Sequence, residues 1–179
     1  MAIAVNRTER IDQAGFKIEE IMNQRELEIC ARKAIDILQD RDRKLFSVKA
    51  SEWAIAHRLA IYLEQEIPGW DVDCEYNKQG QGDVLDTKVS AINAKRNSRP
   101  DIILHHRGEI ELKHNLLVVE LKKEGKNSDL KKTRGYTRKP RLNSRRKYQY
   151  QFGLALSFIP KLEFHWYANG AEIFTSDSP

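Results

Sequence analysis

The sequence is organised around two short apolar runs, Arg99-Pro100-Asp101-Ile102-Ile103-Leu104 and Leu116-Leu117-Val118-Val119-Glu120-Leu121-Lys122. Both have the aliphatic composition of buried strands, yet each carries charges that a buried strand normally excludes. Asp101 lies at the start of the first run, and Glu120 and Lys122 lie at the end of the second. Residues two apart on a strand point to the same face, so the acid and the lysine share one face and the intervening leucine packs on the other.

Pairing of these two strands would bring the carboxylates of Asp101 and Glu120 together beside the ammonium of Lys122. Two adjacent carboxylates repel each other unless a cation lies between them, and hard oxygen ligands suit Mg²⁺, for which Mn²⁺ can substitute. An ammonium beside such a metal can hold a water molecule or neutralise charge on a phosphate. The sequence therefore predicts a metal-dependent site where the two strands meet.

Pro100-Asp101 followed by Glu120-Leu121-Lys122 resembles the motif of the PD-(D/E)XK nuclease superfamily, the restriction-endonuclease-like phosphodiesterases. The resemblance covers about residues 52–160 and implies a reaction class rather than a particular substrate. That class is metal-dependent hydrolysis of phosphodiester bonds in DNA, with RNA as the less favoured substrate.

The resemblance also implies roles for individual residues. Asp101 and Glu120 would hold Mg²⁺, helped by the carbonyl of Leu121. Lys122 would position the attacking water and stabilise charge on the phosphate. Glu52 would complete the site from a preceding helix, because it continues the apolar stripe of that helix and an acid on a buried face needs a partner. The alternative for Glu52 is a position in the first helical turn, where negative charge is favourable.

Hydrophobic periodicity predicts a succession of helices and strands. Helices are expected over 16–39, over 52–66 after a cap at Ser47 or Ser51, and from Asn127 or Ser128 until Pro140 ends the helix. Strands are expected over 70–76, 100–106, 116–122, 152–158 and 162–167, with a long loop or a short excursion at 77–98 and a polar tail.

We therefore expect an α/β fold of the α+β sandwich type, with a central mixed β-sheet of about four to five strands flanked by helices. The core elements follow in αβββαβ order, which the resemblance identifies as a restriction-endonuclease-like core, with an extra helix in front. Residues 1–45 are expected to form a helical extension packed on that core, and residues 46–179 the nuclease-like domain.

A second glutamate-x-lysine triplet, Glu111-Leu112-Lys113, competes with the one at Glu120. The run before Glu120 is the more hydrophobic, which is typical of a central strand, whereas residues 108–111 alternate like an exposed hairpin arm. We therefore favour Glu120 and Lys122.

Other metal-ligating residue types lack the spacing of a metal site. Cys30 and Cys74 are far apart, which predicts reduced, buried thiols. The adjacent His105 and His106 would point to opposite faces of a strand, which favours a structural or surface role over a shared metal ion.

Beyond Lys123 the chain is strongly basic, and only Glu124 and Asp129 oppose the lysines and arginines up to residue 147. Basic residues interleaved with aromatic ones, here Tyr136 and Tyr148, are typical of a surface that binds a phosphate backbone. The alternative is a solvated charged helix. The candidate nucleic-acid-binding residues are Lys123, Lys126, Lys131, Lys132, Arg134, Arg138 and, before the next strand, Gln149 and Gln151.

Composition limits the class of protein. The 179 residues are 40% hydrophobic and 32% charged, which suits one well-cored domain. The net charge of +5 favours an anionic partner. No run approaches the ~20 apolar residues of a membrane span, so we expect a cytoplasmic protein without a membrane partner.

Specificity for DNA, or RNA, would come from loops, a homodimer or a partner protein, because no separate sequence-reading domain is visible. Two alternatives to a nuclease stay open. One is a nucleic-acid-binding protein of the same fold that does not cleave, and the other is a regulatory protein that binds an acidic partner.

Overall fold

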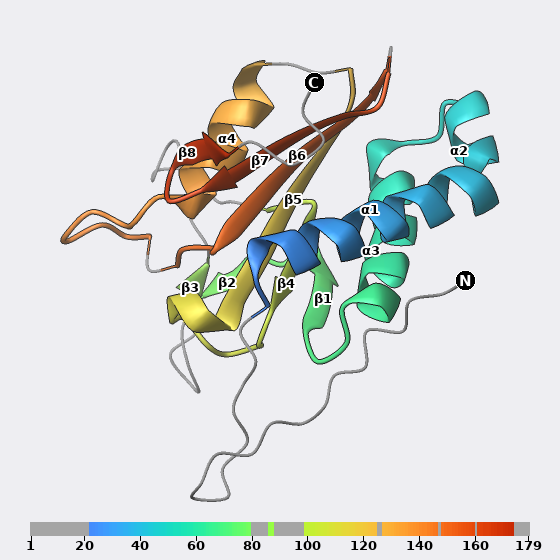
Figure 1. The fold of residues 1–179 in the computed structure, drawn as a ribbon. Helices are drawn as coiled ribbons and strands as arrows, with labels where there is room; N and C mark the ends of the chain where they lie inside the picture. Colours follow the sequence, from blue (N-terminus) through green and yellow to red (C-terminus); the bar gives the residue numbers. More distant parts are fainter. Residues whose placement is uncertain are drawn as a thin grey trace, which may run out of the picture.

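The computed structural model describes residues 22–79, 86–87, 99–124, 127–146, 148–159 and 161–173 (Figure 1). The helices are α1 (Gln24–Arg41), α2 (Arg43–Ser47), α3 (Glu52–Glu66) and α4 (Asn127–Thr137), with a 3-10 turn η1 (Leu112–His114). The strands are β1 (Asp71–Cys74), β2 (Lys78–Gln79), β3 (Asp86–Thr87), β4 (Ile102–His105), β5 (Asn115–Glu124), β6 (Phe152–Ile159), β7 (Glu163–Ala168) and β8 (Ala171–Ile173). None of these helices is long and apolar enough to cross a membrane.

The centre of the fold is a six-stranded mixed sheet in the order β1-β4-β5-β6-β7-β8. Neighbouring strands in this sheet are antiparallel, except that β5 and β6 run parallel. A parallel pair needs a crossover connection, and α4 lies in the segment that joins these two strands. The α+β class with a mixed sheet flanked by helices is therefore confirmed. The described part of this sheet has six strands, one more than the four to five that were expected.

The additional strand is β8, which lies where the sequence predicts a polar tail. Asn169 and Gly170 both have positive φ, 50° and 74°. An Asn-Gly pair in this conformation forms the two-residue turn that best fits the twist of a hairpin, so the chain folds back and β8 pairs with β7. The prediction of a tail was wrong for residues 171–173 because this turn signal was overlooked.

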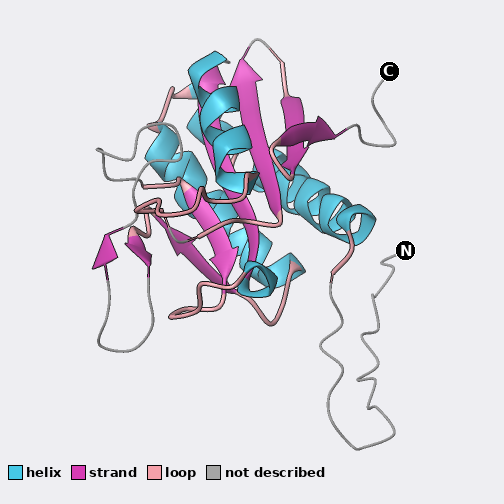
Figure 2. Cartoon of the chain, turned by 90° about the vertical axis from the view of Figure 1, so that its left-hand side faces the viewer, coloured by secondary structure: helices cyan, strands magenta, loops and turns pink. Residues whose placement is uncertain are grey.

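Helices cover both faces of the sheet (Figure 2). On one face, α1 and α3 pack against each other and share a core with β5 residues Leu117, Val119 and Leu121. On the other face, Val118 joins a smaller core that includes Tyr136 of α4. This alternation along β5 confirms that Leu121 packs on the face opposite Val118, as a period of two requires.

The second predicted helix is confirmed residue for residue. α3 spans Glu52–Glu66, and its first turn is capped by Ser51, whose hydroxyl accepts a hydrogen bond from the N–H of Ala54 at 3.2 Å. The cap at Ser51 rather than Ser47 places Glu52 at the first helical position. The N-terminal end of α3 is therefore fixed by a local signal that the sequence contains.

The first helix begins later than predicted. Met22 and Asn23 are not helical, and α1 starts at Gln24, because Asn23 and Glu26 form a capping box in which each side chain accepts the other's backbone N–H. Residues 16–21 of the predicted helix lie outside the described residues. α1 contributes to the same core as the sheet, and position 45, the predicted limit of the extension, lies within α2.

Two predicted loop regions contain defined structure. Within residues 77–98, predicted as a long loop or a short excursion, residues 78–79 and 86–87 pair as β2 and β3, and most of the remainder lies outside the described residues. Residues 108–111 do not form a hairpin arm. Gly108 has a φ of 83°, which turns the chain, and the segment leads into the 3-10 turn η1.

Candidate functional site

The two apolar runs pair as predicted, and this pairing builds the site. In the antiparallel register of β4 and β5, Ile103 lies opposite Val118 and Ile102 lies opposite Val119. One further step along this register places Asp101 opposite Glu120. The carboxylate of Asp101 also accepts a hydrogen bond from the N–H of Leu121 at 2.7 Å, which ties it to β5.

Glu120 is the buried acid of the site, with a side chain only 1% exposed. Its Oε2 accepts a hydrogen bond from Nζ of Lys132 on α4 at 2.7 Å. Its Oε1 is buried and has no hydrogen-bond partner among the described residues. Burial raises the pKa of Glu120 to about 8, and the nearby charge of Asp101 acts in the same direction, whereas Lys132 and Lys122 oppose it.

Lys122 is held by Glu52. Its Nζ donates to Oε2 of Glu52 at 2.9 Å, and both side chains are half-buried. Glu52 lies in the first turn of α3, so the two alternatives for this residue coincide: it is placed at a helix N-terminus and also reaches the site. The contact links α3 to the centre of the sheet.

The pKa of Asp101 is shifted by the same group of charges. Burial raises the pKa of Asp101 above its usual range, while the N–H of Leu121 and the ammonium groups of Lys132 and Lys122 lower it, and Glu52 raises it further. We call these five charged residues, Asp101, Glu120, Glu52, Lys122 and Lys132, the carboxylate–lysine cluster. When all five are ionised, the cluster carries one excess negative charge.

The cluster offers a metal ion two carboxylates rather than a larger ligand set. In the part of the chain that the structure describes, no group of three or more histidine, cysteine, aspartate or glutamate side chains could hold an ion. Mg²⁺ keeps several waters and commonly takes only one or two carboxylates. The orphaned Oε1 of Glu120, with Asp101 opposite, fits such an ion.

Comparison of the chain with protein-family models, curated proteins and solved structures gave no match. The chemistry of the site is therefore inferred from the residues that form it.

Lys132 belongs to the site, although the sequence analysis assigned it to the nucleic-acid-binding surface. It was predicted to bind a nucleic-acid backbone, but the structure sets its ammonium on Glu120. A signal was present in the helical spacing. Thr133, Tyr136 and Thr137 form the buried stripe of α4, and Lys132 lies four residues before Tyr136, beside that stripe.

The other candidates for nucleic-acid contact are not gathered around Glu120. Lys131, Arg134 and Arg138 are exposed on or just after α4, with Arg134 donating to the carbonyl of Gly170 at 2.6 Å. The side chains of Lys123 and Lys126 lie outside the described residues.

Gln149 and Gln151 are turned toward backbone carbonyls, of Thr137 at 2.8 Å and of Lys113 at 3.3 Å. The N–H of Gln151 bonds Asn115, where β5 begins, so the structure does not bring this side chain to Glu120.

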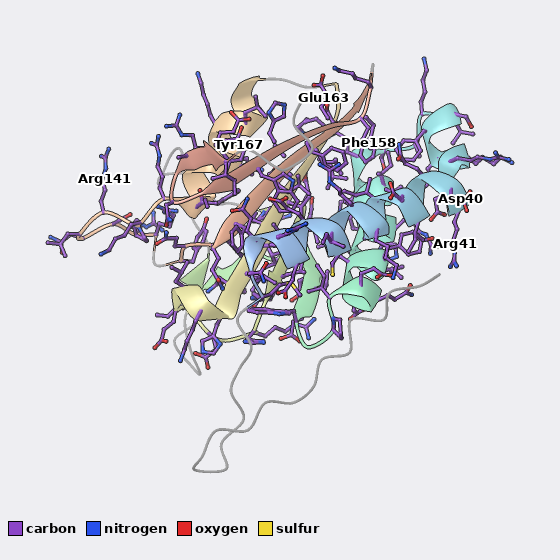
Figure 3. All side chains as sticks on the ribbon, in the orientation of Figure 1. Asp40, Arg41, Arg141, Phe158, Glu163 and Tyr167 are labelled. Atoms are coloured by element: carbon purple, nitrogen blue, oxygen red, sulfur yellow. The ribbon has the colours of Figure 1, made fainter. Side chains whose placement is uncertain are left out.

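The predicted aromatic contribution to a phosphate-binding surface was wrong. Tyr136 and Tyr148 are fully buried and pack with Tyr150 in the smaller core under α4. Tyr136 lies on the inner face of α4, and Tyr148 lies in the segment after the helix that packs against the same core. What stays exposed is the basic loop that follows α4, from which Arg141 extends away from the sheet (Figure 3).

The competing triplet lies outside the site. Glu111 and Lys113 are exposed at η1, before β5 begins, and their side chains pair with each other at 3.4 Å. Glu120 and Lys122 instead lie in the central part of the sheet with Asp101 opposite. The geometry therefore agrees with the choice of the second triplet.

The remaining metal-ligating residue types have structural partners. Nε2 of the buried His105 lies 2.9 Å from Oδ2 of Asp73, and Nδ1 of His106 lies 2.9 Å from Nδ1 of His114. Cys30 and Cys74 form no disulfide, and both are half-buried rather than buried. Burial and neighbouring carboxylates raise the pKa of Cys74 to about 11, so this thiol is not poised as a nucleophile.

Proposed function

We propose that the protein is a divalent-metal-dependent nuclease that hydrolyses phosphodiester bonds of DNA. The observation that carries this proposal is the convergence of Asp101 and Glu120 from adjacent strands, beside the ammonium of Lys122. The chain order α3-β1-β4-β5-α4-β6, with β5 and β6 parallel, supports it, because this is the αβββαβ order that the resemblance to PD-(D/E)XK nucleases implies.

Asp101 and Glu120 would hold the metal, with the Leu121 carbonyl as the additional ligand that the resemblance implies. The pair supplies hard carboxylate oxygens, one of them buried and without a hydrogen bond. A bound Mg²⁺ or Mn²⁺ supplies Lewis-acid polarisation of the phosphate and a more acidic water.

The chain's own cations handle the charge of the substrate. Lys122 is restrained by Glu52 at 2.9 Å, so its ammonium is directed beside the two carboxylates instead of rotating freely. There it would orient water and oppose the negative charge that develops on the phosphate. The exposed basic residues of α4 and of the loop after it would bind the nucleic-acid backbone.

The test is cleavage of supercoiled, linear and single-stranded DNA, and of RNA, in Mg²⁺ or Mn²⁺. Asp101→Asn and Lys122→Met are expected to lower the cleavage rate by about a hundredfold or more, since each removes electrostatic stabilisation of the reaction. Lys113→Met is the matched control, because it removes the lysine of the exposed triplet. Absence of metal-dependent cutting by the wild type on every substrate, or equal loss in all three variants, would refute the proposal.

One observation favours a second candidate, a nucleic-acid-binding protein that does not cleave. Lys132 pairs with Glu120 at an N–O distance of 2.7 Å, so the buried carboxylate has a counter-ion from within the chain. A cluster compensated in this way is stable without any catalytic role. Tight DNA binding that is unaffected by a metal chelator, together with no cleavage, would identify this second function.

A further inference from the structure

Glu120 is paired with a cation that comes from a different layer of the fold. Its carboxylate is 1% exposed in β5, and Lys132 reaches it from α4, on the crossover between β5 and β6. A buried carboxylate is strongly disfavoured unless a positive charge lies beside it, and Lys132 supplies that charge in the metal-free protein.

The contact uses only half of the carboxylate. Lys132 binds Oε2, and Oε1 has no hydrogen-bond partner among the described residues. The Lys132 side chain is 27% exposed, so this residue borders solvent while Glu120 does not. Oε1 of Glu120 can therefore bind a second cation, and Lys132 can move away from Oε2.

The charges of the carboxylate–lysine cluster also suit such an exchange. Its three carboxylates and two ammonium groups leave one excess negative charge. A divalent cation would reverse this to one positive charge, which matches the single negative charge of a phosphodiester. Lys132 and the metal repel each other at the same carboxylate, so both cannot bind it at full strength.

We propose that Lys132 is an exchangeable counter-ion of Glu120. It neutralises Glu120 while no metal is bound, gives up its hold on Oε2 when a divalent cation enters, and then presents its ammonium to the substrate phosphate. This inference rests on the proposed function. It assigns to α4 a regulatory part in the same site: Lys132 sets how readily metal is taken up, and Lys122 acts on the reacting groups.

The exchange predicts an unusual pair of effects for Lys132→Met. Loss of the competing ammonium is expected to tighten binding of Mg²⁺ alone, on the order of tenfold. In EDTA the same variant is expected to have a lower melting temperature than the wild type, because Glu120 has lost its counter-ion. In saturating Mg²⁺ the two melting temperatures are expected to be equal. A lysine with only a structural role would lower both metal affinity and stability.

The experiment compares wild type, Lys132→Met and Lys131→Met at about pH 9, where the Glu120 carboxyl is ionised, by calorimetric titration with Mg²⁺ or Mn²⁺ and by thermal unfolding with and without metal. Lys131 is the exposed neighbour on the same helix and controls for the loss of one positive charge. Lys132→Arg, which keeps the charge, is expected to bind metal as the wild type does. If Lys132→Met does not fold, Lys132→Gln replaces it in the same comparison.

Metal affinity of Lys132→Met that is equal to or weaker than that of Lys131→Met overturns the exchange, as does the absence of metal binding by the wild type and by every variant. A failure of the proposed function is seen separately, as a wild type that binds metal and does not cut. In that case the difference in metal affinity between the two variants still decides the role of Lys132.

Discussion

The buried carboxyl of Glu120 makes a strong prediction about stability and pH. Burial raises the pKa of Glu120 to about 8 in the folded protein, from its usual 4.5. Between these two values the folded protein retains a proton that the unfolded chain has released. The contribution of Glu120 to stability is therefore fully present below the lower value and is lost as the pH rises through the upper one.

The size of the effect follows from the two pKa values. Integrating proton release from about pH 5 to about pH 8 gives a loss of about 3 kcal/mol in the free energy of unfolding. Glu120→Gln has nearly the same shape and does not ionise, so it removes this dependence. The variant should therefore gain about 3 kcal/mol relative to the wild type over the same pH interval.

Urea unfolding in EDTA at the two pH values measures this gain, and EDTA keeps metal from masking it. Comparing variant with wild type cancels the titrating groups that lie far from Glu120. Glu111→Gln serves as the control, because it removes an exposed carboxylate from the competing triplet. A wild-type-to-variant difference that stays constant within about 1 kcal/mol between the two pH values would refute the raised pKa of Glu120.

Three further predictions concern the crossover helix and the basic surface. Gly153→Ala would place a Cβ 2.9 Å from a buried threonine side chain of α4, so urea unfolding should show a loss of about 1–3 kcal/mol, and an unchanged midpoint would contradict this packing. The buried Arg146 guanidinium donates to backbone carbonyls at the end of α4 at 2.7 and 2.9 Å. Arg146→Met should therefore cost about 2 kcal/mol, whereas Arg141→Met, at an exposed position of the same loop, should cost well under about 1 kcal/mol, and equal losses would contradict the capping role. Arg141→Ala should weaken DNA binding evenly across sequences and lower the salt dependence by about one counter-ion, whereas Arg41→Ala, on the opposite side of the molecule in Figure 3, should have no effect, and the reverse pattern would place the interface elsewhere.

The features that could be predicted from sequence are those with local signals. Ser51 and the Pro68-Gly69 pair bracket α3, so the helix could be placed to the residue. The pairing of β4 with β5 followed from two apolar runs with a shared requirement for burial, and that pairing alone determines where Asp101 and Glu120 meet.

Other local signals were present and were overlooked. The capping box of Asn23 and Glu26 marks the start of α1, and the Asn169-Gly170 turn marks the last hairpin. Both are short patterns with a definite physical meaning, the first through satisfied backbone N–H groups and the second through positive φ. Both features could therefore have been predicted from the local sequence.

The contact between Lys132 and Glu120 is different in kind. It depends on how the crossover helix rotates over the sheet, which is fixed by the packing of Tyr136 against Tyr148 and Tyr150 rather than by any local pattern. The same rotation buries the tyrosines that the sequence suggested for nucleic acid. Basic residues on one helix look alike in sequence, and only the tertiary packing separates the lysine that enters the site from those that face solvent.

The residues of the site suit the cation binding that we propose better than a role in stability. Asp101, Glu120 and Lys132 come from three separate segments, and replacing the buried pair of Glu120 and Lys132 together by well-packed apolar residues would cost the fold little, because buried ion pairs rarely stabilise more than good packing does. Glu120 also leaves one oxygen without a hydrogen bond, in a strand whose other inward residues form well-packed cores. Among the described residues, the buried side-chain polar atoms without a hydrogen-bond partner are Oε1 of Glu120 and Nε1 of Trp166. An unsatisfied carboxylate oxygen at the meeting point of two acids and two lysines is the arrangement expected of the cation site that we propose.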